Sequence, residues 1–406
     1  MNSTLGFSTA WLGSFDSAYL FCYALGNYIS GMIGDNFLIR FAVPTGMALA
    51  ALNYVVMAIL CFAEVEAEGA FIVLWGFQGL FQSIVWPGTV SIMANWFSKK
   101  RRGSIMGFWC SNASVGDICG TYGSLVLLVI GVQWQFVIVM NLIFILVVAG
   151  LFLAFVRDSP SKIPGVTNEE ISLLDLYNFK EEEEPDKVRK QGISFWKAWL
   201  LPGVLIYALN YACIKLLNYS MMMWLPYYLN KQVNVSDNLV KVITSLFDFG
   251  GIIGAFVCGW ISDKVKCRTP VISLMLIVAL PIYPLFLVGT ESTYWLYFIL
   301  VPIQGFLVSG AAGLISCVVA ADLAQNEEIA NNKETVSTVT GILDGTGSVG
   351  AGIGQLTIGF LAEVSWYLVF VFMMVIGVTG ISLLVPTFIK EVKKIRAQKS
   401  LTKYYN

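Results

Sequence analysis

The residues Gly31-Met-Ile-Gly-Asp35, followed by Arg40, recur in the sequence as Gly259-Trp-Ile-Ser-Asp263, followed by Arg268. Glycine, aspartate and arginine have the same spacing in both copies. Each copy ends a long apolar run, so the repeat divides the chain into two related halves. The fold class that we predict is an all-α polytopic membrane protein built from these halves.

The composition supports this class. Of the 406 residues, 57% are hydrophobic and 13% are charged, and the mean hydropathy is +0.73. A bilayer-spanning helix needs roughly 20 mostly apolar residues. Runs of this kind predict eleven spans, near residues 14–34, 41–63, 69–94, 104–131, 134–156, 199–229, 241–261, 270–289, 294–321, 335–362 and 366–389.

The division into five and six spans leaves the halves unequal. The second copy of the repeat follows the second span of its half, whereas the first copy follows the first span. We therefore expect the first transmembrane helix to be missing, either from the protein or from this sequence. A vacancy beside the helix at 14–34 would then expose polar residues such as Tyr23 and Asn27.

Positive charge predicts the orientation of the chain. Of its 25 Lys and Arg residues, all but Lys215, Lys231 and Lys241 fall in alternate loops or the C-terminal tail, as the positive-inside rule requires of cytoplasmic segments. The predicted organisation is an N-terminal bundle of five spans (1–156), a cytoplasmic linker (157–198), a C-terminal bundle of six spans (199–389) and a basic cytoplasmic tail (390–406).

Several chemistries are disfavoured. The chain has no histidine and shows no nucleophile–base pair and no metal cluster, so we expect neither an enzyme nor a bound metal or cofactor. The eight cysteines are scattered, and we expect them to be small buried hydrophobes rather than redox groups. The partners that we expect are the lipid bilayer and a small solute, not nucleic acid.

The repeat, Gly-x-x-x-Asp with a following Arg, resembles the loop signature of major facilitator transporters. More specific runs resemble the organophosphate:phosphate antiporters, and within them the eukaryotic sugar-phosphate exchangers of solute carrier family 37. These runs are Trp86-Pro87, Asn95-Trp-Phe-Ser-Lys-Lys-Arg-Arg-Gly103, Arg157-Asp-Ser-Pro160, Trp224-Leu-Pro226 and Asp344-Gly-Thr-Gly-Ser348. The resemblance implies two helical bundles around a central cavity that opens alternately to each side. It also implies exchange of a sugar phosphate or glycerol phosphate for inorganic phosphate, and it favours the endoplasmic reticulum or another endomembrane, with the plasma membrane as alternative.

Lys215 is the only Lys or Arg well inside a predicted span. Because a charge at this depth is costly, such a residue usually faces a cavity or a partner. We predict that Lys215 anchors the anionic solute, and the alternative is neutralisation by an acidic neighbour. Asn218 and Tyr219 lie three and four positions beyond it and share its helix face.

The resemblance supplies further candidates. Aromatic residues at the positions of Tyr23, Trp86, Trp109 and Tyr219 are expected to line the cavity. Asn218 and Asn27 stand where the bacterial exchanger has basic residues. Asn112 lies near a family histidine and cannot carry a proton. The predicted substrate-binding set is therefore Lys215, Asn218, Tyr219, Tyr23, Asn27, Trp86, Trp109 and Asn112.

Acidic residues complete the prediction. Asp117, Asp248 and Asp344 lie at membrane depth, where Asp248 or Asp344 could pair with Lys215 and each could serve gating or helix pairing. By resemblance, Asp35 with Arg40 and Asp263 with Arg268 hold the halves together on the cytoplasmic side. Two other functions stay open: a degenerate carrier retained as a sensor or scaffold, and a transporter of an unphosphorylated sugar or organic anion.

Overall fold

The computed structural model describes residues 9–65, 67–97, 102–160, 192–324 and 335–405. Within these ranges the chain is helical and contains no β-strand. Most of the predicted linker, residues 161–191, lies outside the described residues. The fold class predicted from the sequence, an all-α membrane protein, is confirmed.

The N-terminal helices, α2 to α8, contain two that are broken near their middle. The chain turns at Ser83–Ile84 between α4 and α5, shortly before Pro87, and at Ser111 between α6 and α7. The helices are α2 (Thr9–Asn36), α3 (Ile39–Phe62), α4 (Glu68–Gln82), α5 (Val85–Trp96), α6 (Arg102–Cys110), α7 (Asn112–Val129) and α8 (Gln135–Phe155).

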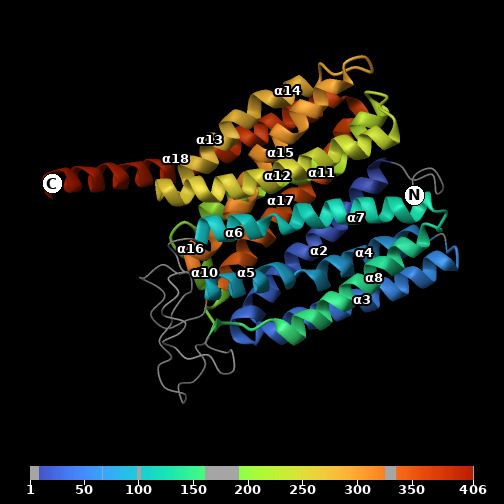
Figure 1. The fold of residues 1–406 in the computed structure, drawn as a ribbon, viewed down its shortest axis with the longest axis horizontal. Coiled ribbons are helices and arrows are strands. Elements are labelled where there is room, and N and C mark those ends of the chain that lie inside the picture. The colour runs from blue at the N-terminus through green and yellow to red at the C-terminus, as the bar shows by residue number, and fades with distance from the viewer. Residues whose placement is uncertain (1–8, 66, 98–101, 161–191, 325–334, 406) are drawn as a thin grey trace.

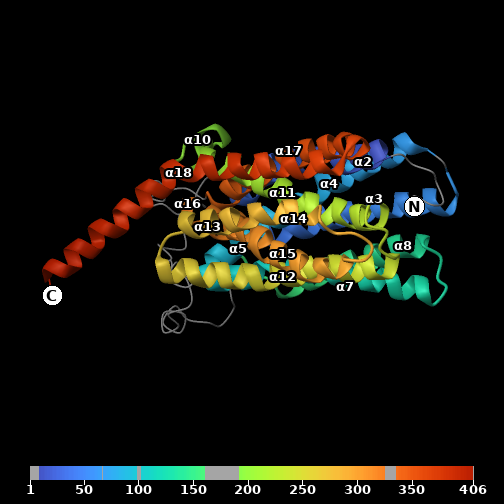
Figure 2. The ribbon, with the colours of Figure 1, turned by 90° about the horizontal axis from the view of Figure 1, so that it is seen from above.

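The C-terminal helices, α10 to α18, run beside the N-terminal set (Figure 1). They are α10 (Phe195–Trp199), α11 (Val204–Lys231), α12 (Asp237–Val265), α13 (Thr269–Ala279), α14 (Tyr283–Phe286), α15 (Tyr297–Gly313), α16 (Ala320–Ala324), α17 (Val336–Val364) and α18 (Trp366–Tyr405). A π-helical segment, Leu314–Val319, joins α15 to α16. The C-terminal part of α18 projects beyond the other helices in both views (Figures 1 and 2).

Seven helical stretches among the described residues are long and apolar enough to cross a membrane, so the chain is an integral multi-pass membrane protein. They are Ile39–Phe62, Glu68–Trp96, Gln135–Phe155, Asp237–Val265, Thr269–Phe286, Tyr294–Ala324 and Trp366–Lys393. The predicted count of eleven is not confirmed, because α2, α7, α11 and α17 do not meet this criterion. These helices carry many of the candidate site residues, and polar groups at membrane depth lower a span's apolarity.

Close helix packing depends on glycine. A Cβ at Gly341 of α17 would lie 2.4 Å from the carbonyl oxygen of Asn27 on α2, and one at Gly31 would lie 2.9 Å from that of Ser337. Small residues at membrane helix contacts permit this approach. The α2–α17 contact therefore joins the two sets of helices closely along their length.

Gly254 of α12 offers a stability test of this packing. A Cβ there would lie 2.1 Å from the carbonyl oxygen of Phe306 on α15, and backbone cannot move aside cheaply. We expect Gly254→Val to lower the free energy of unfolding by about 1–3 kcal/mol, seen as earlier loss of the monodisperse peak on heating in detergent. Gly69→Val is the control, because nothing lies within 4 Å of that position. Equal thermal stability of the two variants would contradict this account of the packing.

The prediction that Asn27 is exposed beside a vacancy is wrong. Asn27 is 0% exposed, because the close approach of α2 to α17 covers that face of α2. The exposed polar groups lie on α7 instead, where no residue is buried. Asn112 and Asp117 are both exposed on this helix.

The prediction that the cysteines serve only as small hydrophobes is wrong for one pair. Cys110 at the end of α6 and Cys317 in the π-helical segment form a disulfide between residues 207 positions apart. The other six cysteines are free. The sequence offered no sign of this pair, because only the packing of α6 against Leu314–Val319 brings the two sulfurs together.

Candidate functional site

Lys215 lies at the centre of a buried polar cluster between α11 and α17. Its ammonium is 2.7 Å from Oδ1 of Asp344 and donates a 2.8 Å hydrogen bond to Oγ of Ser348. Lys215 and Asp344 are each 3% exposed. The sequence left Asp248 and Asp344 open as partners, and the structure selects Asp344.

Three tyrosine rings surround the ammonium. The ring centroids of Tyr23, Tyr219 and Tyr211 lie 5.1, 5.4 and 5.7 Å from Nζ of Lys215, respectively. Ring faces at such distances attract a cation. Tyr23 comes from α2, so this cluster includes a residue from the N-terminal helices. Tyr211 was missed, although its position four residues before Lys215 places it on the same helix face.

One carboxylate oxygen of this cluster accepts no hydrogen bond from the described residues. Oδ2 of Asp344 is buried and has no hydrogen-bond partner in the described structure. A buried polar atom without a partner is uncommon in proteins and usually has a specific reason. Asp344 therefore keeps an unused acceptor beside an ion pair.

Glycines of α17 make room for the lysine. A Cβ at Gly347 would lie 2.9 Å from Cδ of Lys215 and 2.6 Å from the ring of Tyr211. One turn further, a Cβ at Gly350 would lie 2.7 Å from Ala212. The glycine-rich run of α17 thus admits the side-chain stem of Lys215, as close helix packing requires.

The two predicted asparagines, Asn218 and Asn27, take different roles. Asn218, on α11, accepts a 2.6 Å hydrogen bond from the Ser309 hydroxyl of α15. Asn27 donates from Nδ2 to the carbonyl oxygen of Tyr23 at 3.0 Å, while its Oδ1 is buried without a partner in the described structure. Tyr23 thus connects Asn27 to the Lys215 cluster through its own backbone.

The remaining candidates lie in other contacts. Trp86 and Trp109 stack with ring centroids 5.3 Å apart, and Asn112 donates to the carbonyl oxygen of Trp109 at 2.6 Å. The structure gives none of these three a contact with Lys215. Asp117 and Asp248 form no ion pair among the described residues, where no three metal-ligating side chains converge either.

Two aspartates of the repeated motif bind helix N-termini across the halves. Asp35, at the end of α2, accepts from the backbone N–H groups of Ser337 and Thr338 at 2.9 and 2.8 Å. Asp263, near the end of α12, accepts from those of Gly103 and Ser104 at 3.1 and 2.7 Å. Carboxylates satisfy the free donors and the positive dipole end of a helix. Each contact therefore closes the same end of the bundle, and we call the two of them the latches.

The arginines that follow these aspartates behave differently. Arg268 is 2.8 Å from Asp263 and 3.1 Å from Asp322. Burial opposes its charge, but Asp322 and Asp263 outweigh that effect and raise its pKa. Arg40 does not pair with Asp35, in contrast to the prediction. Its guanidinium donates to the Leu153 carbonyl oxygen of α8 at 2.8 Å, because Arg40 begins α3 on the face that packs against α8.

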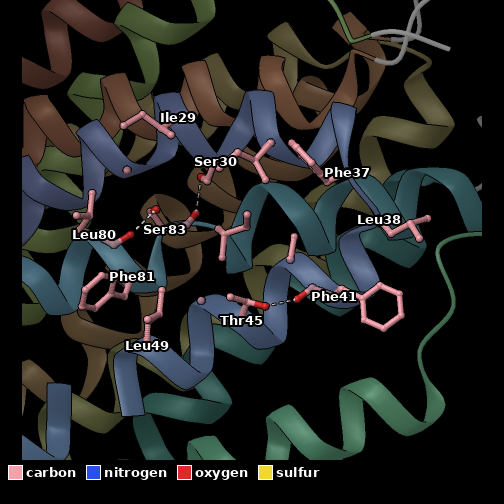
Figure 3. A pocket seen from close by; sticks show the side chains of 15 residues that line it. Ile29, Ser30, Phe37, Leu38, Phe41, Thr45, Leu49, Leu80, Phe81 and Ser83 are labelled. Atoms are coloured by element: carbon pink, nitrogen blue, oxygen red, sulfur yellow. Dashed lines mark hydrogen bonds between the residues drawn. The ribbon is translucent and has the colours of Figure 1, made fainter. Parts of the chain in front are cut away.

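A large cavity lies elsewhere, on the flank of the N-terminal helices. It measures about 760 Å³ and opens between α2, α3 and α4, with Phe37, Phe41 and Leu49 in its apolar lining (Figure 3). The hydroxyls of Ser30, Thr45 and Ser83 in this lining bond to backbone oxygens. The cavity lacks a charged residue, so it does not suit a phosphorylated solute.

Comparison with known proteins places these features in context. A model of the Major Facilitator Superfamily matches residues 1–331. Sugar phosphate exchanger 3 of Mus musculus is 34% identical, over 95% of this chain and 81% of that protein. Putative glycerol-3-phosphate transporter 5 of Arabidopsis thaliana is 34% identical, over 93% of this chain and 79% of that protein.

A solved structure agrees with the fold. The crystal structure of the human organic anion transporter MFSD10 (TETRAN) superposes with a TM-score of 0.63, covering 92% of this chain and 83% of that one. The sequence identity is 16%, so this likeness concerns the fold alone.

Proposed function

The chain belongs to the major facilitator superfamily, within the group that includes the sugar phosphate exchangers, and from this premise we propose that it exchanges a phosphorylated metabolite for inorganic phosphate. The solute would be a sugar phosphate or glycerol phosphate, as the names of the relatives suggest. The chain is accordingly a carrier rather than an enzyme. Its partners are the small anionic solute, phosphate and the bilayer.

The observation that carries the proposal is the buried ammonium of Lys215. A phosphate group must lose much of its water to enter a membrane protein, and a desolvated ammonium offers it opposite charge and three donors. Ser348 and Tyr219 lie against the same ammonium. They would supply hydroxyl hydrogen bonds to an anion that takes the place of Asp344 on Lys215.

The latches support alternating access. They close one end of the bundle, where Asp35 and Asp263 each bind backbone of the other half. Releasing them would let the two predicted bundles, residues 1–156 and 199–389, move apart at this end and expose Lys215. We place this end in the cytoplasm, with the linker and tail, and the protein in the endoplasmic reticulum or another endomembrane. The plasma membrane is the alternative location.

The ion pair between Lys215 and Asp344 also gives weight to a second candidate. A lysine already neutralised by a carboxylate could bind a carboxylate solute or could serve only packing. An organic-anion carrier, or a degenerate carrier acting as a sensor, would show this arrangement too. Inorganic phosphate distinguishes these functions, because only the proposed exchanger must recognise it.

Counterflow tests the proposal directly. Purified protein in liposomes loaded with inorganic phosphate is expected to take up radiolabelled phosphate well above protein-free liposomes. External glucose 6-phosphate or glycerol 3-phosphate should compete, whereas glucose should not. Liposomes without internal phosphate are the control and should show little uptake. Uptake that does not depend on internal phosphate would contradict exchange, and competition by glucose would favour a sugar carrier.

A further inference from the structure

Lys215 and Asp344 form a buried unit whose charges cancel. Their side chains are each 4% exposed, and the ammonium lies 2.7 Å from the carboxylate. An anion that binds Lys215 adds negative charge to this unit while Asp344 keeps its own. Charge buried without a partner is costly, because the surroundings screen it far less than water does. The loaded site therefore needs an additional positive charge.

We propose that Asp344 takes up one proton when an anion binds Lys215, so that the carrier moves a proton together with its anionic solute. This rests on the proposed function, since it requires an anion at Lys215. The proton is released by a buffer molecule in the surrounding solution and bonds to a carboxylate oxygen of Asp344. The ion pair between Lys215 and Asp344 is replaced by one between Lys215 and the anion. With a monoanion, the loaded site is as neutral as the empty one.

Among the described residues, the groups around Asp344 supply no second positive charge. Lys215 is its one cationic contact in this part of the chain, and the phenols that face it are Tyr19 and Tyr23 from α2 and Tyr211 and Tyr219 from α11. Phenols are neutral in the physiological range and cannot add positive charge. Within the described residues, no further charged side chain of α5, α10, α16 or α18 contacts Asp344.

Buried polar atoms without a hydrogen-bond partner recur along α17, from Asp344 toward the start of the helix. Oδ2 of Asp344 has no hydrogen-bond partner in the described structure, and neither do Oγ1 of Thr340 and Oγ of Ser337, one and two turns earlier. Asn27 contributes its unpartnered Oδ1 from α2. Unused hydrogen-bonding atoms are what a transient chain of water molecules needs.

Linkage makes the effect of pH predictable. If anion binding promotes protonation of Asp344, protonation promotes anion binding by the same factor. Apparent affinity for an anion should therefore rise as pH falls. One-for-one exchange returns a proton with every phosphate, so the net proton flux is small. Proton uptake is therefore best measured when phosphate binds, rather than as a proton flux during exchange.

The test is calorimetric binding of inorganic phosphate in two buffers of different ionisation enthalpy. We expect wild-type protein to take up about one proton more per bound phosphate than the double variant Lys215→Arg, Asp344→Asn, in which the carboxylate is gone and the guanidinium stays charged whether or not phosphate is bound. Phosphate's own ionisation is common to both proteins and cancels. Asp237→Asn is the matched control, because this exposed aspartate pairs with Asn230 far from Lys215 in sequence. It should keep the wild-type proton count.

Each outcome decides between explanations. Equal proton uptake by wild type and the double variant Lys215→Arg, Asp344→Asn overturns the proposal while leaving phosphate exchange intact. Failure of wild type to bind phosphate overturns both. If the double variant does not fold, the wild-type count decides alone, because a count no greater than that of phosphate's own ionisation overturns proton uptake.

Discussion

Replacing Lys215 with Met is expected to weaken phosphate binding by about ten- to a hundred-fold, because it removes a charge-assisted hydrogen bond that contributes roughly 1.5–3 kcal/mol. Methionine keeps most of the apolar stem. The measurement is the apparent affinity for phosphate in counterflow by reconstituted protein. Lys231→Met is the matched control, since this exposed lysine ends the same helix. It should leave the affinity unchanged.

Because Lys215 forms an ion pair with Asp344, Lys215→Met also affects the stability of the protein. Met at position 215 leaves the Asp344 carboxylate buried without its cation, and breaking a buried pair costs about 3–5 kcal/mol. We therefore expect Lys215→Met to lower thermal stability as well. The double variant Lys215→Met, Asp344→Asn removes both charges and should recover stability without recovering phosphate affinity. Unchanged affinity in either folded variant would show that Lys215 is not the anion anchor.

Replacing both latch aspartates, Asp35→Asn with Asp263→Asn, is expected to open the end of the bundle that they close. An asparagine retains one acceptor oxygen but loses the charge that favours a helix N-terminus. Losing an N-terminal cap costs about 0.5–2 kcal/mol, so two losses should shift the ratio of closed to open molecules by roughly five- to a thousand-fold.

Spin-label distances between the end of α2 and the start of α17 would report this opening. Each single variant should give an intermediate distribution of distances, because the latches bind different helices. Asp237→Asn is the control, because Asp237 lies in the first turn of α12 and takes no part in either latch. A double variant with the wild-type distribution would mean that packing between α2 and α17, rather than the latches, keeps this end closed.

Several properties could be predicted from the sequence because each is written in a local pattern. Apolar runs defined a helical membrane protein, and the repeated Gly-x-x-x-Asp motif defined its family. Lys215 stood out because a lone cation within an apolar run is costly wherever the helix packs. Its helix face was also predictable, since Tyr219 follows four residues later and the period of a helix is fixed.

Only the tertiary structure decided which of these faces meet. Lys215 pairs with Asp344, which lies 129 positions away, and not with Asp248. Asp35 binds the start of α17 and not Arg40. Cys110 meets Cys317 across a comparable separation. Helical periodicity determines which side of a helix a residue occupies, but the neighbour on that side depends on how whole helices pack. Glycines such as Gly347 then set how closely they approach, and therefore which atoms touch.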